Sequence, residues 1–253
     1  MNIGFEDGWL MNGEVEVVGI KIDNVNMDEA AALMEVFLET DRCSKVFTPN
    51  SEILLTAVKD REFESVLNSG HLVVPDGIGV VIASRFYGTP VKERVAGFDL
   101  MMRLMDIADS RGKSVYLLGG REGVAEEAAI KLTESYGNLK IAGTRNGYFE
   151  EDSENDIVNE INNSKADILL AALGAPKQEK FIYKHSDNLK VKIAMGVGGS
   201  LDVLAGKVKR APEFYQKAGL EWFYRLVKEP RRIIRVLRIP KFIALAFYDA
   251  KLK

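Results

Sequence analysis

Short apolar runs alternate along most of the chain with segments whose apolar residues recur at helical spacing. Two strand-like runs in EVEVVGIKI come first, and the helical pattern of MDEAAALMEVFLET follows. The further strand candidates are KVFTPN, HLVVPDG, SVYLLGG, LKIAGT, ADILLAALG and VKIAMGVGG. Most of these runs are apolar throughout, which is typical of strands buried on both faces of a parallel sheet. Helices are expected between them, at about residues 51–69, 98–111, 121–136, 153–164 and 177–187.

This alternation predicts an α/β fold that is Rossmann-like, with a mainly parallel sheet covered by helices. The pattern changes after residue 199, where the chain becomes helical and contains no convincing strand. Pro212, Pro230 and Pro240 divide this part into short pieces, because proline removes an amide donor and clashes inside a helix. We therefore expect a flexible leader over 1–13, an α/β domain over 14–199 and a helical appendage over 200–253.

The formal net charge of −3 is unevenly distributed. From Lys207 to Lys253 there are 13 Lys or Arg against 4 Asp or Glu, a balance of +9, and the preceding part has a balance of −12. A basic appendage on an acidic body indicates an anionic partner such as phosphate, nucleic acid or an acidic membrane surface.

The cysteine count and the first residues of the chain indicate the cellular compartment of the protein. Cys43 is the single cysteine, so no disulfide framework is possible within the chain, and a reducing environment fits best. The start, MNIGFEDGWLMNGE, lacks the basic segment and apolar core of a secretory signal. No uninterrupted apolar stretch reaches the roughly 18 residues needed to span a bilayer. We expect a cytoplasmic protein that touches a membrane without crossing it.

Polar side chains follow two of the predicted strands. Asp76 lies between Pro75 and Gly77, where an apolar strand stops and a helix begins, and Thr48 and Asn50 have the same place in VFTPNSEILL. Ligands of open α/β sheets bind beyond the carboxyl ends of the strands, so a hydroxyl, an amide and a carboxylate would meet there. The structural alternative is that Asn50 caps a helix and Asp76 caps a turn.

Other strand ends give weaker signals. Gly119 and Gly120 in SVYLLGGREG fit a tight turn as well as a phosphate or sugar cradle at a helix start. The dinucleotide fingerprint is incomplete, since the sequence has GGxxG and then Lys140 where an acid belongs, which makes NAD binding a minor alternative. In LGAPKQEKF, Gln178 either completes a helix cap or binds a sugar hydroxyl. Arg94 either solvates the surface or grips a phosphate.

The tail sequence EWFYRLVKEPRRIIRVLRIPKF combines aromatic, aliphatic and basic residues. Ile233, Ile234 and Leu237 fall on one side of a helix. Arginines occupy much of the opposite side, which fits an interfacial helix on anionic lipid. The alternative is a terminal helix packed on its own domain with a solvated basic face. The histidines, His71 and His185, are expected to have structural roles.

Taken together, the segments VFTPNSEIL, VVPDGIGVV, ERVAGFDL, YLLGG, LGAPKQEKF and VGGSLDVLAGKVKRAP followed by EWFYRL resemble the WecG/TagA/CpsF family of bacterial glycosyltransferases. The resemblance covers about residues 14–240. It implies transfer of N-acetylmannosamine from UDP-N-acetylmannosamine to undecaprenyl-diphosphate-linked N-acetylglucosamine, which forms the β-1,4 disaccharide lipid of a wall-teichoic-acid linkage unit. No cofactor is expected.

The resemblance assigns roles to the candidate residues. Asp76 would be the general base of an inverting displacement. Sugar hydroxyls and the N-acetyl group would be held by Thr48, Asn50 and Gln178, and phosphate or acceptor by Arg94. No convincing DxD motif is present, so no metal is expected, and the tail arginines Arg225, Arg232 and Arg235 would neutralise the UDP diphosphate.

Two alternatives remain open at this point. One is a related family transferase that uses N-acetylmannosaminuronic acid, and the other is a nucleotide-binding or membrane-binding module without catalysis. The partners expected from the main interpretation are the UDP-sugar, the prenyl-diphosphate acceptor and the anionic inner face of the cell membrane, to which the protein would bind peripherally. A homo-oligomer is possible, and no nucleic-acid partner is expected.

Overall fold

The structure of the protein, a computed structural model, describes residues 5–6, 9–10 and 13–252. The side chains of 5, 6, 9, 10, 217, 225, 232 and 235 are not part of that description. The leader predicted over 1–13 therefore lies mostly outside the described residues, apart from Gly13 and two paired strands, β1 (Phe5–Glu6) and β2 (Trp9–Leu10).

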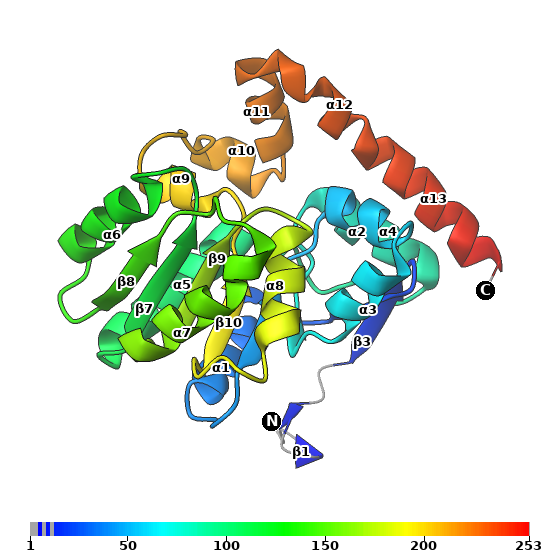
Figure 1. The fold of residues 1–253 in the computed structure, drawn as a ribbon. Coiled ribbons are helices and arrows are strands. Elements are labelled where there is room, and N and C mark those ends of the chain that lie inside the picture. The colour runs from blue at the N-terminus through cyan, green and yellow to red at the C-terminus, as the bar shows by residue number, and fades with distance from the viewer. Residues whose placement is uncertain (1–4, 7–8, 11–12, 253) are drawn as a thin grey trace.

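A parallel six-stranded sheet forms the centre of the molecule, in the order β6-β5-β10-β9-β7-β8 (Figure 1). Its strands are β5 (Ser44–Phe47), β6 (Leu72–Val73), β7 (Ser114–Gly119), β8 (Lys140–Arg145), β9 (Ile168–Ala172) and β10 (Ile193–Gly196). The α/β fold class predicted from the alternation of strands and helices is thus confirmed.

Helices cover both faces of the sheet, which explains the continuous apolar strands. Successive strand residues point to opposite faces: Val115 and Leu117 belong to one core cluster, and Tyr116 and Leu118 to the other. The first cluster is closed by α1 (Met27–Phe37), α5 (Gly97–Ser110), α6 (Val124–Ser135) and α9 (Ser200–Leu204). The second is closed by α2 (Ser51–Ala57), α3 (Arg61–Asn68), α4 (Ile78–Ser84), η1 (Arg85–Tyr87), α7 (Glu154–Ser164) and α8 (Lys177–His185). A short 3-10 helix, η2 (Glu151–Ser153), precedes α7.

The helix predicted over about 51–69 is two helices, α2 and α3. The break occurs because the Asp60 carboxylate accepts a hydrogen bond from the Phe63 amide at 3.1 Å and so caps a new helix start. Neither glycine nor proline marks this position, which is why hydrophobic spacing alone merges the two helices.

A small antiparallel hairpin precedes the sheet, with strands β3 (Glu14–Val17) and β4 (Ile20–Asp23). Its two-residue turn places Val18 and Gly19 at φ of 50° and 85°, the left-handed geometry that fits the twist of paired strands. Asp23 joins the hairpin to the sheet, because its carboxylate accepts a hydrogen bond from the Val73 amide at 2.7 Å.

The C-terminal part consists of helices joined by turns and irregular segments, and its described residues include no strand. It contains α10 (Glu213–Lys217), α11 (Glu221–Lys228), η3 (Pro230–Arg232), α12 (Ile233–Val236) and α13 (Arg238–Leu252). These elements rise above the body and return along α2 and α4 (Figure 1). Phe242 and Ala246 of α13 are fully buried in this contact. The predicted boundary at 199/200 stays a prediction, and α9 just beyond it contributes Leu201 to the core.

Candidate active site

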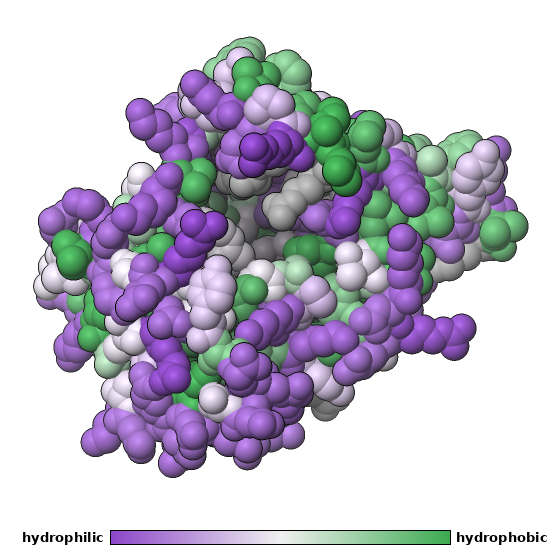
Figure 2. Space-filling view, turned by 45° about the horizontal axis from the view of Figure 1, so that its top comes forward, coloured by the Kyte–Doolittle hydropathy of each residue, from purple (hydrophilic) through white to green (hydrophobic). Residues whose placement is uncertain are grey.

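A cavity of about 560 Å³ lies between the carboxyl ends of the strands and the C-terminal helices. Figure 2 shows the hollow between these two parts. Its walls come from six regions: α2, the loop before α4, the loop before α5, the loops after β9 and β10, and the appendage. The residues used below are Asn50, Glu52, Thr56, Asp76, Arg94, Gln178, Gly198, Glu221, Trp222 and Arg238. The position agrees with the general location of ligand sites in open α/β sheets.

Backbone hydrogen bonds hold the loop that carries Asp76 in place. The Asp76 amide donates to the Pro49 carbonyl at 3.2 Å, and the Pro75 carbonyl accepts from the Val95 amide at 3.1 Å. Gly77 follows with φ of 94°, a conformation that favours glycine. The carboxylate is therefore presented at the cavity by a loop fixed on both sides.

Gly97 brings Asp76 and Thr48 together. A Cβ atom at Gly97 would lie 2.7 Å from the Thr48 hydroxyl oxygen and 3.4 Å from an Asp76 carboxylate oxygen. Both side chains consequently occupy the space that the glycine leaves empty at the start of α5. Sequence reasoning named Thr48 and Asp76 but missed Gly97, because a glycine at a helix start gives no signal of what it faces.

Asn50 both caps a helix and lines the cavity. Its side-chain oxygen accepts from the backbone amides of Glu52 and Ile53 at 2.9 and 3.2 Å, which completes the start of α2. The structural alternative for this residue is therefore correct, and it does not exclude a contact with ligand. The amide nitrogen of Asn50 is the group that remains to donate into the cavity.

Gln178 links two loops of the site. It is 4% exposed, and its side-chain oxygen accepts from the backbone amides of Gly174 at 3.1 Å and Gly198 at 3.0 Å. Those residues belong to the loops after β9 and β10. A Cβ atom at Gly196 would come within 2.8 Å of the Gln178 amide nitrogen, so a glycine is needed under this side chain.

Glu179 is a buried acid that sequence reasoning missed. One carboxylate oxygen accepts from the Gln178 amide nitrogen at 2.8 Å. The other oxygen has no hydrogen-bond partner among the described residues. Burial raises the pKa of Glu179 to about 7, because charging a desolvated carboxyl is unfavourable. Glu179 is hydrogen-bonded to Gln178, a residue of the cavity wall, so a change in the protonation of Glu179 would alter a contact of that wall.

Charged residues join the appendage to the body beside the cavity. Arg94 donates to a Glu221 carboxylate oxygen at 3.2 Å, and the Arg210 Nε lies 3.5 Å from the other oxygen. Arg210 also donates to Asp99 at 2.7 Å, and its guanidinium lies 4.6 Å from the centre of the Phe98 ring. Arg94, Asp99, Arg210 and Glu221 thus form one network of charged contacts between the body and the appendage. Glu221 and Arg210 give no signal in the sequence, since their roles depend on contacts across more than a hundred positions.

Comparison with known proteins agrees with this arrangement. A family model described as "Glycosyl transferase WecG/TagA/CpsF family" matches residues 15–253. The chain belongs to this family. It is therefore a member of a glycosyltransferase family, as the motifs in the sequence predict.

Two relatives within the family have the same name, N-acetylglucosaminyldiphosphoundecaprenol N-acetyl-beta-D-mannosaminyltransferase. The one from Bacillus subtilis (strain 168) is 38% identical over 208 residues, which cover 82% of this chain and 80% of its own. The one from Staphylococcus aureus (strain MRSA252) is 34% identical over 232 residues, which cover 91% of each chain. The similarity thus extends through most of the α/β body and into the appendage.

Four of the residues predicted for a family site line this one cavity: Asn50, Asp76, Arg94 and Gln178. Thr48 lies beside Asp76 around Gly97. The role of each residue stays a prediction. Their position around one cavity is compatible with joint contact with one set of substrates.

Gly119 and Gly120 do not line this cavity. A Cβ atom at Gly119 would lie 2.3 Å from the Ala172 carbonyl oxygen, and one at Gly120 would lie 2.7 Å from the Val124 side chain. Close packing of β7 against β9 and α6 accounts for both glycines. Their predicted contact with substrate has no support from the cavity.

The predicted tail arginines Arg225, Arg232 and Arg235 are in α11, η3 and α12. Their side chains lie outside the described residues. Two of the elements that carry them border the cavity, α11 through Trp222 and α12 through Val236. The Trp222 indole nitrogen is buried and has no hydrogen-bond partner in the described part of the chain, so the wall contains a donor that a ligand could satisfy.

The histidines and the acidic loop near residue 151 lie in structural contacts. His71 accepts from the Lys45 amide at 2.9 Å, and burial lowers its pKa to about 4. His185 lies 2.9 Å from a Glu154 carboxylate oxygen. Within the described residues, no group of three or more His, Cys, Asp or Glu is placed to hold a metal ion.

Proposed function

We propose that the protein transfers N-acetylmannosamine from UDP-N-acetylmannosamine to undecaprenyl-diphosphate-linked N-acetylglucosamine, with formation of a β-1,4 bond. Membership in the glycosyltransferase family and the printed names of the relatives support the reaction. The observation that carries the proposal is the presentation of Asp76, beside Thr48, at a cavity that the appendage closes. The product would be the disaccharide lipid of a wall-teichoic-acid linkage unit.

Asp76 would act as the general base of a single displacement. Its carboxylate takes the proton of the acceptor's C4 hydroxyl while that oxygen forms a bond to the anomeric carbon of the donor. The bond between the anomeric carbon and the diphosphate oxygen breaks, and UDP leaves with the electron pair. Because attack and departure occur on opposite faces, the configuration at the anomeric carbon inverts.

The remaining side chains would bind and orient the substrates. Thr48 offers a hydroxyl next to the base, and Asn50 offers its amide nitrogen, since its oxygen is used by the helix cap. Gln178 uses its oxygen to hold two loops, so its contribution to a sugar is limited to the amide hydrogen that Glu179 does not accept. Arg94 would bind a phosphate or the acceptor from the cavity wall, where it already pairs with Glu221, so the Glu221 pair would open or share the guanidinium with the ligand.

Charge on the departing diphosphate requires cations. The proposal keeps Arg225, Arg232 and Arg235 as the groups that neutralise it. The helices of Arg225 and Arg235, α11 and α12, border the cavity, and η3, which carries Arg232, packs against both of them. It follows that transfer should continue in the presence of a metal chelator. Loss of transfer with EDTA, restored by a divalent cation, would assign this neutralisation to a metal.

Release of UDP tests the activity directly. The protein is incubated with a short-chain prenyl-diphosphate N-acetylglucosamine and, separately, with UDP-N-acetylmannosamine, UDP-N-acetylmannosaminuronic acid and UDP-N-acetylglucosamine. We expect UDP and a disaccharide lipid with the first donor alone. Product with the uronate donor would favour the related transferase, and no UDP with any donor would favour a binding module without catalysis.

We also propose that the appendage binds an anionic membrane surface at the cytoplasmic face, where the lipid acceptor would lie. Exposed apolar residues on α11 and α12 and after them include Val227, Ile234 and Leu237, which are 62%, 69% and 59% exposed. Figure 2 shows hydrophobic residues near the top of the molecule, beside hydrophilic ones. Apolar residues next to basic ones favour an anionic interface. No helix in the described residues is both long and apolar enough to cross a bilayer.

Sedimentation with vesicles tests this surface. The wild-type protein should sediment with vesicles that contain phosphatidylglycerol and remain in solution with phosphatidylcholine alone. The double variant Ile234→Ser/Leu237→Ser should lose most of this binding. Ile130→Ser is the matched control, because Ile130 is 57% exposed on α6, away from the appendage. Equal binding by the double variant would contradict the proposal.

A further inference from the structure

A second, smaller groove continues from the active-site cavity along α2. Its volume is about 220 Å³, and it lies between the end of α2 and the first turn of α13. Its lining residues are Leu55, Thr56, Lys59, Asp60, Arg238 and Lys241. Thr56 and Arg238 also line the active-site cavity. The two spaces therefore share a wall, with Asn50 and Asp76 toward one end and Lys59 and Lys241 toward the other.

The groove carries an excess of positive charge. Lys59, Arg238 and Lys241 line it, against the single acid Asp60. That acid is already engaged: one oxygen caps α3, and the other accepts from Lys180 at 3.1 Å. Arg238 lies 2.7 Å from a Glu52 carboxylate oxygen in a half-exposed pair. Such a pair exchanges partners at little cost.

Two cations of the groove are available for a ligand. Lys59 and Lys241 are exposed, and within the described side chains neither forms a hydrogen bond or an ion pair. Two available lysines and an exchangeable arginine around one depression fit an anion with more than one negative charge, such as a diphosphate.

The direction of the groove matches the chemistry of the acceptor. In a β-1,4 transfer the attacking hydroxyl is at C4 of the acceptor sugar, and the diphosphate is at C1, on the opposite side of the ring. The seven residues of α2 span roughly 10 Å at about 1.5 Å per residue. A sugar whose C4 hydroxyl reaches Asp76 can therefore extend its C1 substituent along α2 toward Lys59.

We propose that Lys59, Arg238 and Lys241 form the subsite for the diphosphate of the prenyl-linked acceptor. This inference rests on the proposed function, because the acceptor gives the subsite its occupant. The UDP diphosphate would lie elsewhere in the larger cavity. Since Ile234 and Leu237 are exposed just before Arg238, the prenyl chain would leave the groove beside the surface proposed to meet the membrane.

The test separates binding of the acceptor from binding of the donor. The double variant Lys59→Gln/Lys241→Gln is compared with wild type on a water-soluble, short-chain prenyl-diphosphate N-acetylglucosamine. We expect the KM for this acceptor to rise about tenfold or more, since the variant removes two charge-assisted contacts with the diphosphate. The KM for the UDP-sugar should stay within about twofold. Lys140→Gln/Lys190→Gln removes two exposed lysines elsewhere and should change neither KM.

Two outcomes would overturn the subsite. The first is a rise in the donor KM instead of the acceptor KM, which would assign the lysines to the UDP diphosphate. The second is an unchanged acceptor KM. If binding to phosphatidylglycerol vesicles weakens at the same time, the groove is assigned to a lipid headgroup.

A binding measurement keeps this inference distinct from the proposed activity. Titration calorimetry with the same prenyl-diphosphate sugar reports on the groove even where no UDP is released with any donor. Wild-type protein should bind it more tightly than its prenyl monophosphate counterpart, and the double variant should lose that preference. Binding with no preference for the diphosphate would refute the subsite, while binding without UDP release would refute only the activity.

Discussion

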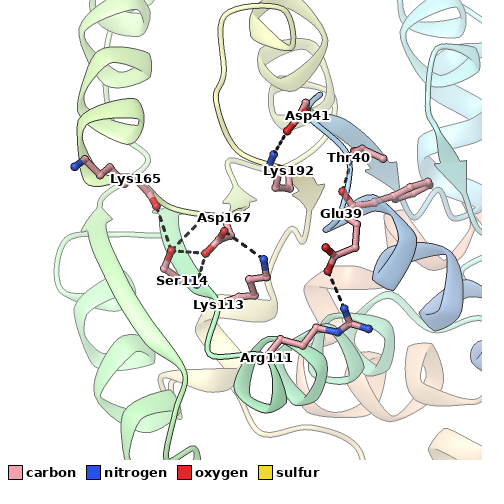
Figure 3. A network of polar contacts seen from close by, with 10 residues as sticks. Glu39, Thr40, Asp41, Arg111, Lys113, Ser114, Lys165, Asp167 and Lys192 are labelled. Carbon is pink, nitrogen blue, oxygen red and sulfur yellow. Dashed lines mark hydrogen bonds and ion pairs between the residues drawn. The ribbon is translucent and has the colours of Figure 1, made fainter.

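Charged and polar side chains gather both at the carboxyl ends and at the amino ends of the strands of the central sheet. These two sides of the sheet, called its carboxyl edge and its amino edge below, place their side chains in different surroundings. At the carboxyl ends of the strands, Asp76, Arg94 and Gln178 line a cavity. At the amino ends, side chains bind one another (Figure 3). Asp167 accepts from the amide and the hydroxyl of Ser114 at 2.8 and 2.7 Å, and Lys192 donates to Asp41 at 2.8 Å.

One side of the sheet therefore forms a ligand site, and the opposite side holds structural contacts. Asp167 comes immediately before β9, and Asp76 comes three residues after β6. As residue types they are identical. They differ in position, because Asp167 precedes a strand and Asp76 follows one. In a parallel sheet an acid before a strand lies near the starts of the other strands, and an acid after a strand lies near the loops that form a ligand site.

Asp76→Asn should have the largest effect on activity. It preserves the shape of the side chain but removes the base, so turnover should fall by about 10²- to 10⁴-fold, with a thermal midpoint close to wild type. The measurement is UDP release under saturating substrates. Asp41→Asn at the opposite edge is the matched control and should retain wild-type turnover. An Asp76→Asn protein with near-normal turnover would remove Asp76 from the role of base.

Gln178→Ala, at the carboxyl edge, and Asp167→Ala, at the amino edge, should have the next largest effects and test whether the two edges differ in their role in catalysis. Each removes an acceptor of two hydrogen bonds, and each should lower the free energy of unfolding by about 1–3 kcal/mol, as expected when buried donors lose their partner. Only Gln178→Ala should also raise the KM values, because it frees the loops after β9 and β10. Urea unfolding and steady-state kinetics measure the two effects. A kinetic defect in the properly folded Asp167→Ala protein would contradict the division between the edges.

Much of the fold could be predicted from local sequence. All six strands of the sheet overlap runs predicted as strands, most of them apolar, and α1, α5, α6, α7 and α8 lie close to the predicted helices. Asp60 shows where local reasoning fails: the cap that divides α2 from α3 is one carboxylate without glycine or proline beside it. A side chain of this kind is equally compatible with the middle of a polar helix face, so the boundary depends on a hydrogen bond that the spacing does not reveal.

The site was predictable where it depends on strand ends, and not where it depends on distant contacts. Asp76, Asn50 and Gln178 follow strands, so the topology of a parallel sheet brings them together. Glu221 reaches Arg94 across 127 positions, and its motif position gives no indication of that partner. Glu179 reads as an ordinary first-turn acid, and only the packing around α8 shows that it is buried.

Glu179 should give the carboxyl edge a pH dependence of stability. Its folded pKa, about 7, is raised above the ordinary value of 4.5, so the folded state holds a proton more tightly than the unfolded state. The contribution of the protonated group is complete below about pH 4.5 and is lost as the pH rises through about 7. Glu179→Gln should remove this loss, and the gain at pH 8 relative to pH 5 should be on the order of 2 kcal/mol.

Urea unfolding of wild type and Glu179→Gln at pH 5 and pH 8 measures this difference. Asp23, whose pKa burial raises to about 6, produces a change of the same sign, but it is present in both proteins and cancels in the comparison. A difference between the two proteins that does not vary with pH would show that Glu179 does not titrate in this interval.

Arg111→Met should have the smallest effect and completes the contrast between the edges. Arg111 follows α5 and donates to Glu35 at 2.6 Å and to Glu39 at 2.8 Å, in pairs that are well exposed. Exposed pairs contribute about 0.2–1 kcal/mol each and are screened by salt. The free energy of unfolding should therefore fall by no more than about 2 kcal/mol for the two pairs together, the deficit should shrink at high salt, and turnover should be unchanged. A reduced turnover would mean that charge at the amino ends of the strands affects the distant site, because the Arg111 guanidinium donates to Glu35 and Glu39, which do not line the cavity.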